Sequence, residues 1–207
     1  MATAVKICGI TRVEDALVAA NAGAHAVGLI FASKSRRLVP DLVAAEVVRA
    51  LPPFVTPVAL FVDQQAAEIE RVLAKVRPQL LQFHGDEPAD FCASFGVPYI
   101  KVLRMRPGVD LLQYAQNYRT AKGLLLDAFV EGNHGGTGST FDWALIPREL
   151  PLPLILAGGL NPGNIGEAVR RVRPWAVDVS SGVEASRGIK DAAKVAAFIR
   201  GVRDADV

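Results

Sequence analysis

The sequence predicts one (β/α)8 barrel domain spanning residues 1–207. Short runs of β-branched and other apolar residues alternate with longer segments of helical periodicity, the pattern of βα units and a parallel sheet. Eight such runs are present, and a chain of 207 residues with 51% hydrophobic content is long enough for one sizeable core. This length is near the lower limit of about 200 residues for a (β/α)8 barrel. An open doubly wound sheet is the alternative.

The eight expected strands are runs of four to six residues, which suits strands better than helices. In chain order they are AVKI (4–7), AVGLIF (26–31), PVALF (57–61), LLQF (80–83), YIKVL (99–103), GLLL (123–126), PLILA (153–157) and AVDVS (176–180).

Seven segments between these runs have helical periodicity: Val13–Asn21, Asp41–Ala50, Ala66–Val76, Pro88–Phe95, Asp110–Tyr118, Asn164–Val172 and Asp191–Val202. The crossover that opens at FDWALI (141–146) is too short for a full helix. Thr11 and Glu14 fit a capping box that begins the first helix.

Side chains alternate across a strand, so Lys6 and Cys8 should share one face and the apolar residues between them the other. We expect the apolar face to meet the helices and the polar one to point into the barrel. The same reasoning predicts inward side chains at these further polar positions: Gln82, His84, Lys101, Asp127, Asp178 and Ser180. Buried polar groups need partners, and Lys6 pairing with Asp178 on the adjoining strand is a purely structural reading of that pair.

Active sites of such barrels lie at the C-terminal ends of the strands. The sequence places Cys8, His84, Asp127 and Ser180 there, which makes them site candidates. Lys6, Gln82 and Asp178 are further candidates for the lining of the site. The alternative for Cys8 is a small buried hydrophobic residue, the usual fate of a free cysteine.

Two glycine-containing loops predict a phosphate site. AGGLNPGNI (157–165) follows the seventh strand and SSGVE (180–184) follows the eighth, where such barrels often bind phosphate through backbone N–H groups. A third loop, 128–141, contains GNHGGTGST and is long enough to indicate a functional role. The alternative for each glycine cluster alone is that it forms a tight turn and binds no ligand. The expected phosphate-binding residues are Gly136, Gly138, Gly158, Gly159, Ser180, Ser181 and Gly182.

Composition excludes several classes of protein. Two cysteines cannot form a disulfide framework, and the three histidines do not fall at metal-ligand spacing, so we expect a reduced, cytoplasmic protein without a bound metal. A net charge of +2, with basic residues spread along the chain, argues against a nucleic-acid surface. We expect no export signal and no membrane span, because no apolar run approaches about 20 residues.

Seven motifs together resemble the phosphoribosylanthranilate isomerase family of tryptophan biosynthesis. They are KICGITR, GLIF followed by KSRR, LQFHGDE, LLLDA, GGTGSTFDW, AGGLNPGNI and DVSSGVEASRGIKD, and they cover essentially the whole chain. The resemblance implies an Amadori rearrangement that converts N-(5-phospho-β-D-ribosyl)anthranilate into 1-(2-carboxyphenylamino)-1-deoxyribulose 5-phosphate, without metal or cofactor. It also implies a small-molecule substrate, and a chain that is either a monomer or a homodimer.

The resemblance assigns a role to three residues. Cys8 is the expected general base and Asp127 the expected general acid, because opening the sugar ring needs an acid and removing the C2 proton needs a base. Arg37 is expected to hold the anthranilate carboxylate, where a guanidinium suits a planar anion, and Arg36 is the competitor for that role. Lys6 is a candidate to favour the Cys8 thiolate. Cys92 receives no role.

Three other functions compete with this one. A Schiff-base aldolase of the same fold would use Lys101 as its amine. An isomerase of the histidine pathway would resemble this chain except that its family has an aspartate where Cys8 stands. A barrel that binds a phosphosugar without turning it over, as a sensor or a partner subunit, is the non-catalytic alternative.

Overall fold

The computed structural model describes residues 2–106, 108–128, 141–147 and 149–206. Eight parallel strands form a closed barrel in chain order, and the first strand pairs with the eighth. The expectation of a (β/α)8 barrel is therefore confirmed, and the open sheet is excluded. The barrel strands are β1 (Ala4–Cys8), β2 (Ala26–Ile30), β3 (Thr56–Phe61), β4 (Leu80–Phe83), β5 (Tyr99–Met105), β6 (Leu124–Ala128), β7 (Leu154–Leu156) and β8 (Ala176–Val179).

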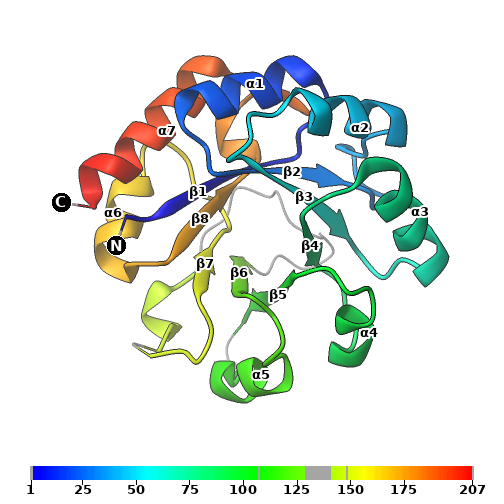
Figure 1. Ribbon diagram of the computed structural model, residues 1–207. Coiled ribbons are helices and arrows are strands. Elements are labelled where there is room, and N and C mark those ends of the chain that lie inside the picture. The colour runs from blue at the N-terminus through cyan, green and yellow to red at the C-terminus, as the bar shows by residue number, and fades with distance from the viewer. Residues whose placement is uncertain (1, 107, 129–140, 148, 207) are drawn as a thin grey trace.

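Helices surround the barrel, and α7 packs against α1 beside the junction of the first and last strands (Figure 1). The helices are α1 (Val13–Ala22), α2 (Asp41–Ala50), α3 (Ala66–Val76), α4 (Ala89–Ala93), α5 (Leu111–Asn117), α6 (Ile165–Val172) and α7 (Ala192–Ala205). Among its described residues, the crossover expected to be short contains a 3₁₀ turn, Trp143–Leu145, and no α-helix. Every expected element is present, within three residues at each end.

Three local features differ from what the sequence predicts. The Thr11 hydroxyl donates to the Gly188 carbonyl (2.6 Å) instead of capping α1, whose N-cap is Arg12. Helix α4 is much shorter than the segment expected to be helical. An antiparallel pair that is not among the expected elements follows β8: β9 (Glu184–Ser186) and β10 (Ile189–Lys190).

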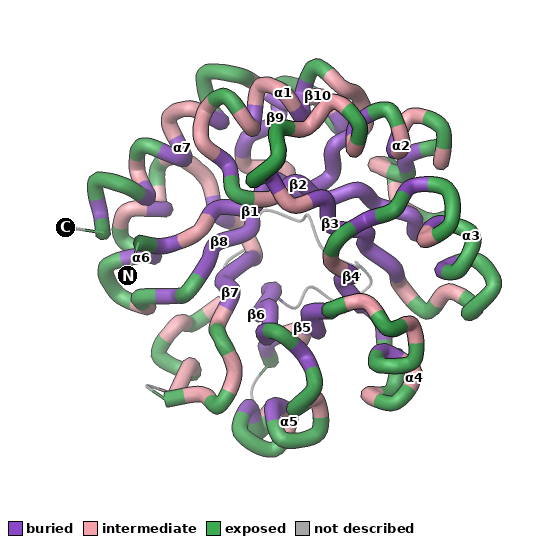
Figure 2. The backbone as a smooth tube through the Cα atoms, in the orientation of Figure 1, coloured by how far each residue is buried: buried purple, intermediate pink, exposed green. Residues whose placement is uncertain are grey.

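The main core lies between the barrel and the helices, and Figure 2 shows buried strands inside a half-buried and exposed outer ring. A separate apolar cluster fills the barrel interior from the strands β5 to β8. Several of its members lie two residues before a polar residue of the same strand, and therefore on the same face: Ala4 before Lys6, Leu80 before Gln82, Leu125 before Asp127 and Ala176 before Asp178. The polar residues thus stand above an apolar floor, toward the C-terminal mouth.

The strand register corrects the expected direction of Lys101. Ile100 is the partner of Gln82, so these two side chains point to the same side of the sheet, into the barrel. Lys101 consequently points outward, where it is fully buried beside Glu87 and the ring of Tyr118. A polar residue between two apolar ones does not by itself tell the two faces of a barrel strand apart.

Candidate active site

A cavity of about 1160 Å³ opens at the C-terminal ends of the strands. Among the residues predicted for the site, eleven line it: Cys8, Arg36, Arg37, Gln82, His84, Asp127, Gly158, Gly159, Asp178, Ser180 and Ser181. Lys6 and Gly182 are not part of its wall. Gly136 and Gly138 lie outside the described residues.

Cys8 ends β1 with its side chain at the cavity. Burial raises the pKa of the Cys8 thiol; Lys6 acts to lower that pKa, but Asp178 raises it further. Lys6 Nζ donates to Asp178 Oδ1 at 2.8 Å, so the predicted pairing of these two residues is confirmed. Because burial is the largest of these effects, the pKa of Cys8 lies above its ordinary value, and the thiol is the major form at neutral pH.

Each carboxylate oxygen of Asp127, on β6, has one polar neighbour. Oδ1 accepts the backbone N–H of Ala128 at 2.9 Å, and Oδ2 lies 3.3 Å from Nε2 of His84. On the other side of the imidazole, His84 Nδ1 lies 3.5 Å from the Gln82 amide nitrogen. The bond from Ala128 orients the carboxyl group at the cavity wall, and His84 Nε2, which makes no hydrogen bond to the described residues, lies next to its other oxygen.

The loops after β7 and β8 lie against each other. Gly158 and Gly159 both have positive φ, 84° and 65°, which a side chain would strain. A Cβ at Gly182 would collide with the Leu160 carbonyl, so this glycine allows the two loops to approach closely. Ser180 presents a buried hydroxyl oxygen that has no partner among the described residues. Such an oxygen in a cavity wall fits a polar ligand.

Arg37 is fixed by an acidic residue that sequence reasoning missed. Its Nε and Nη2 donate to the two carboxylate oxygens of Glu184 at 2.7 and 2.8 Å. The same Glu184 accepts a bond from Lys190 at 3.1 Å. These bonds raise the pKa of Arg37, and they lower that of Glu184 although burial acts against this. The guanidinium is thus held at the edge of the cavity.

Comparisons with known proteins decide the family. The sequence profile of the N-(5'-phosphoribosyl)anthranilate (PRA) isomerase family matches residues 5–201. The chain is 57% identical to N-(5'-phosphoribosyl)anthranilate isomerase of Nitrosospira multiformis over 202 residues, 98% of this chain and 97% of the relative. Identity to the Pseudomonas aeruginosa protein of the same name is 58% over 202 residues, 98% of this chain and 96% of that one. The chain belongs to the phosphoribosylanthranilate isomerase family.

Solved structures agree with this assignment. A phosphoribosylanthranilate isomerase in complex with reduced 1-(o-carboxyphenylamino)-1-deoxyribulose 5-phosphate superposes with a TM-score of 0.86 at 39% identity, covering 98% of this chain and 99% of that one. The enzyme from Thermotoga maritima gives a TM-score of 0.89 at 40% identity, with the same coverage.

Lys101 cannot serve this isomerase as the amine of a Schiff base, since its ammonium group lies outside the barrel. Nζ donates to Glu87 Oε2 at 2.8 Å and to the Gly85 carbonyl at 2.7 Å, and its side chain is fully buried. The hypothesis of a Schiff-base aldolase that uses Lys101 is therefore wrong. Cys92 is also buried away from the cavity, and burial raises the pKa of its thiol to about 12.

Gly28, the first residue of the motif GLIF, is a second residue near the site that sequence reasoning missed. It is the strand partner of Cys8 on β2. A Cβ at this position would lie 2.7 Å from Cys8 Sγ and 3.0 Å from Lys6 Nζ. The absence of a side chain at Gly28 therefore makes room for the thiol.

We expect Gly28→Ala to lower kcat by at least about tenfold, because the added methyl group displaces the sulfur of Cys8, the residue expected to act as the base, and small displacements of a reacting group are costly. Overpacking should also destabilise the fold by about 1–3 kcal/mol. Steady-state kinetics and thermal unfolding measure the two effects. Gly166→Ala, which adds a methyl group to α6 at ordinary contact distance, is the control and should leave kcat unchanged.

Proposed function

We propose that this chain catalyses the Amadori rearrangement of N-(5-phospho-β-D-ribosyl)anthranilate to 1-(2-carboxyphenylamino)-1-deoxyribulose 5-phosphate, the isomerisation for which its family is named. The observation that carries the proposal is the position of Cys8 and Asp127 on the first and sixth strands, both facing one cavity. A base and an acid on separate strands can act on different atoms of the same sugar. The reduced product bound by a solved relative supports the same substrate class.

The proposed reaction begins at the ring oxygen. Asp127 gives its proton to that oxygen as the C1–O bond breaks, and the nitrogen lone pair forms the C1=N bond of an iminium. Cys8, as thiolate, takes the proton from C2; the C2–H electrons form the C1=C2 bond of an enolamine, and the π electrons of the C1=N bond return to nitrogen. The enolamine gains a proton at C1 and loses one from its C2 hydroxyl, which gives the aminoketose.

Lys6 supports the base in this scheme. It lies two residues before Cys8 on the same face of β1 and acts to lower the pKa of the thiol, although burial outweighs this effect. The pKa of Lys6 itself is raised: burial acts to lower it, but Asp178 and Cys8 outweigh that effect. Lys6 therefore stays a cation throughout the neutral range and stabilises a thiolate next to it.

The substrate phosphate is proposed to bind between the loops after β7 and β8. Gly158, Gly159, Ser180 and Ser181 line this part of the cavity, and the partnerless Ser180 hydroxyl is a donor for a phosphate oxygen. Gly182 shapes the site by letting the loops meet. Gly136 and Gly138 remain proposed phosphate contacts from the motif alone.

Arg37 is proposed to bind the anthranilate carboxylate, with Glu184 holding it in place. We expect Arg37→Ala to raise KM far more than it lowers kcat, because a carboxylate remote from the reacting carbon is bound about equally in the ground and transition states. Steady-state kinetics separate the two constants. Arg36→Ala is the matched control, since Arg36 lines the same cavity. A larger KM effect for Arg36 would transfer the role to that residue.

A turnover assay tests the function directly. The purified chain is incubated with N-(5-phosphoribosyl)anthranilate, and substrate and product are separated by chromatography. Formation of the aminoketose phosphate supports the proposal, whereas tight binding without turnover would favour a non-catalytic phosphosugar sensor.

The assembly is proposed to be a monomer or a homodimer. A solved relative from Thermotoga maritima is a monomeric form generated from a dimeric enzyme.

Among the described residues, every helix is too short or too polar to span a lipid bilayer.

A further inference from the structure

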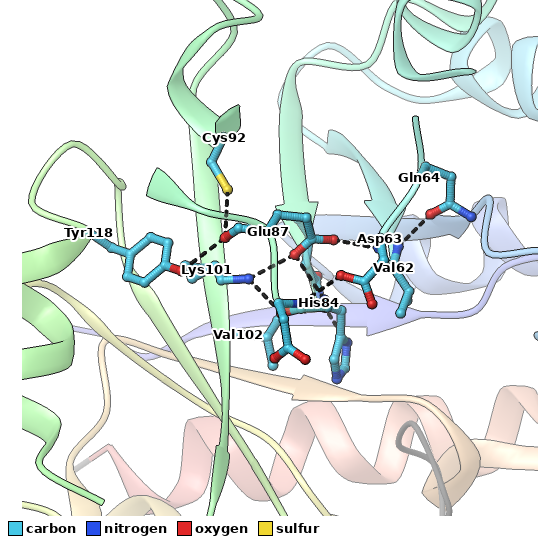
Figure 3. A network of polar contacts seen from close by, with 12 residues as sticks. Val62, Asp63, Gln64, His84, Glu87, Cys92, Lys101, Val102 and Tyr118 are labelled. Atoms are coloured by element: carbon cyan, nitrogen blue, oxygen red, sulfur yellow. Dashed lines mark hydrogen bonds and ion pairs between the residues drawn. The ribbon is translucent and has the colours of Figure 1, made fainter. Parts of the chain in front are cut away.

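The buried ion pair between Lys101 and Glu87 lies behind the active site, between the barrel and the helices α4 and α5. Figure 3 shows Glu87 between Lys101 and Asp63, with His84 beside it. Lys101 is fully buried and Glu87 is 4% exposed. The catalytic scheme above uses neither residue, yet a buried ion pair costs desolvation that an apolar pair would not.

This pair holds the turn that follows β4. Glu87 Oε2 accepts the backbone N–H of Gly85 at 3.0 Å, and Lys101 Nζ donates to the Gly85 carbonyl at 2.7 Å. Both backbone polar groups of the residue after His84 are thus bound by the two partners of one ion pair. The pair therefore fixes the backbone from which His84 projects.

The pair is itself anchored from three sides. Glu87 Oε1 accepts the backbone N–H of Asp63 at 2.8 Å, which ties the turn after β4 to the loop after β3. The Glu87 carbonyl accepts bonds from the Tyr118 hydroxyl at 2.9 Å and from the Cys92 thiol at 3.7 Å. Contacts from β5, from α4 and from the end of α5 therefore hold the turn after β4 in place through Glu87.

We propose that the Lys101–Glu87 pair positions His84 against the Asp127 carboxyl group, and that turnover depends on this. His84 is held at its backbone N–H by Phe61 O (2.9 Å) and at its carbonyl by Arg104 Nη2 (2.9 Å). Its imidazole reaches Asp127 Oδ2 at 3.3 Å. Lys101 and Glu87 are positioning residues, because they act through His84 and lie outside the cavity wall. This inference rests on the proposed isomerase function.

Three variants test it: Glu87→Gln, Lys101→Met and the two combined. Each single variant leaves one buried charge unpaired and should destabilise the protein, whereas the double variant has no buried charge and should regain much of that stability. We expect kcat to be roughly 10- to 100-fold lower in all three, with KM little changed, because the turn loses its hold on His84. If the double variant recovered kcat together with its stability, the pair would contribute to stability alone, and the positioning role would be contradicted.

A double-mutant cycle with His84→Ala tests whether Glu87 affects kcat through His84. His84→Ala should lower kcat by itself, and adding Glu87→Gln to His84→Ala should lower it no further. If Glu87→Gln lowered kcat by the same factor with and without His84→Ala, the two residues would act independently and the proposal would be wrong. Tyr99→Phe removes the hydrogen bond of a buried residue on the same strand, to Thr120, and should leave kcat unchanged. An inactive parent chain would instead contradict the isomerase function, so the two failures are distinguishable.

Discussion

Cys8→Ser should lose on the order of 10³-fold in kcat while it folds like the parent protein, because a hydroxyl gives up its proton far too reluctantly at neutral pH to replace a thiolate base. The two side chains are almost isosteric, and Cys8 is 4% exposed beneath the cavity, so packing changes little. Steady-state kinetics measure the loss, and thermal unfolding verifies the fold. Near-normal turnover of Cys8→Ser would mean that this cysteine only packs, and His84 would become the first candidate for the base.

Alkylation tests the same thiol in the unmodified protein. Burial raises the pKa of Cys8, so the thiolate fraction at neutral pH is smaller than that of a free cysteine and grows as the pH rises through and beyond the ordinary thiol pKa of about 8.5. Inactivation by iodoacetamide should therefore be slow at neutral pH and accelerate with pH. A bound product analogue should slow it by covering the cavity.

Cys92 is the internal control for the alkylation experiment. It lies in α4 with no exposed surface, and burial raises its pKa to about 12, so it should not react at any pH at which the protein is assayed. Cys92→Ala removes only the 3.7 Å bond to the Glu87 carbonyl, which keeps its 2.9 Å bond from Tyr118, so the variant should retain both the activity and the pH dependence of inactivation. Inactivation that follows modification of Cys92 instead would contradict the role given to Cys8.

The sequence predicted the barrel and the cavity wall because both depend on patterns along single strands. Alternation along β1 and β8 placed Cys8 and Asp178 inside, and the strand ends placed Asp127 at the mouth. The same alternation misplaced Lys101, because both faces of a barrel strand are buried and polarity alone does not tell them apart. Only the register with β4, which pairs Ile100 with Gln82, decides the direction.

Residues that act over long sequence separations were missed for a different reason. Glu184 meets Arg37 from 147 positions away, and it is placed there by the short β9–β10 pair, which has no recognisable strand pattern. In its motif, SSGVE, the serines and the glycine fit a phosphate site, whereas nothing in the local sequence indicates a partner for the glutamate. Similarly, Thr11 satisfies a capping pattern but bonds to Gly188, since the loop before β10 packs against it. At both places tertiary contacts, and not the structural preferences of the local sequence, determine the structure.

Asp127→Asn should lose on the order of 10²- to 10⁴-fold in kcat, because the amide keeps the shape of the carboxyl group but cannot deliver a proton to the ring oxygen. The amide oxygen can still accept the Ala128 N–H that Oδ1 accepts, so the side chain keeps its orientation and the protein should fold. Steady-state kinetics with the cyclic substrate measure the loss, and thermal unfolding verifies the fold.

A substrate analogue that already lacks the closed ring separates the acid role from other roles of Asp127. Such an analogue needs no proton on a ring oxygen, so its turnover, if the enzyme accepts it, should be far less sensitive to Asp127→Asn than turnover of the cyclic substrate. Cys8→Ser should impair both substrates alike, because removal of the C2 proton is common to them. Equal sensitivity of both substrates to Asp127→Asn would place this carboxyl group in a later step, where its contact with His84 at 3.3 Å would make proton return to the enolamine the first alternative to test.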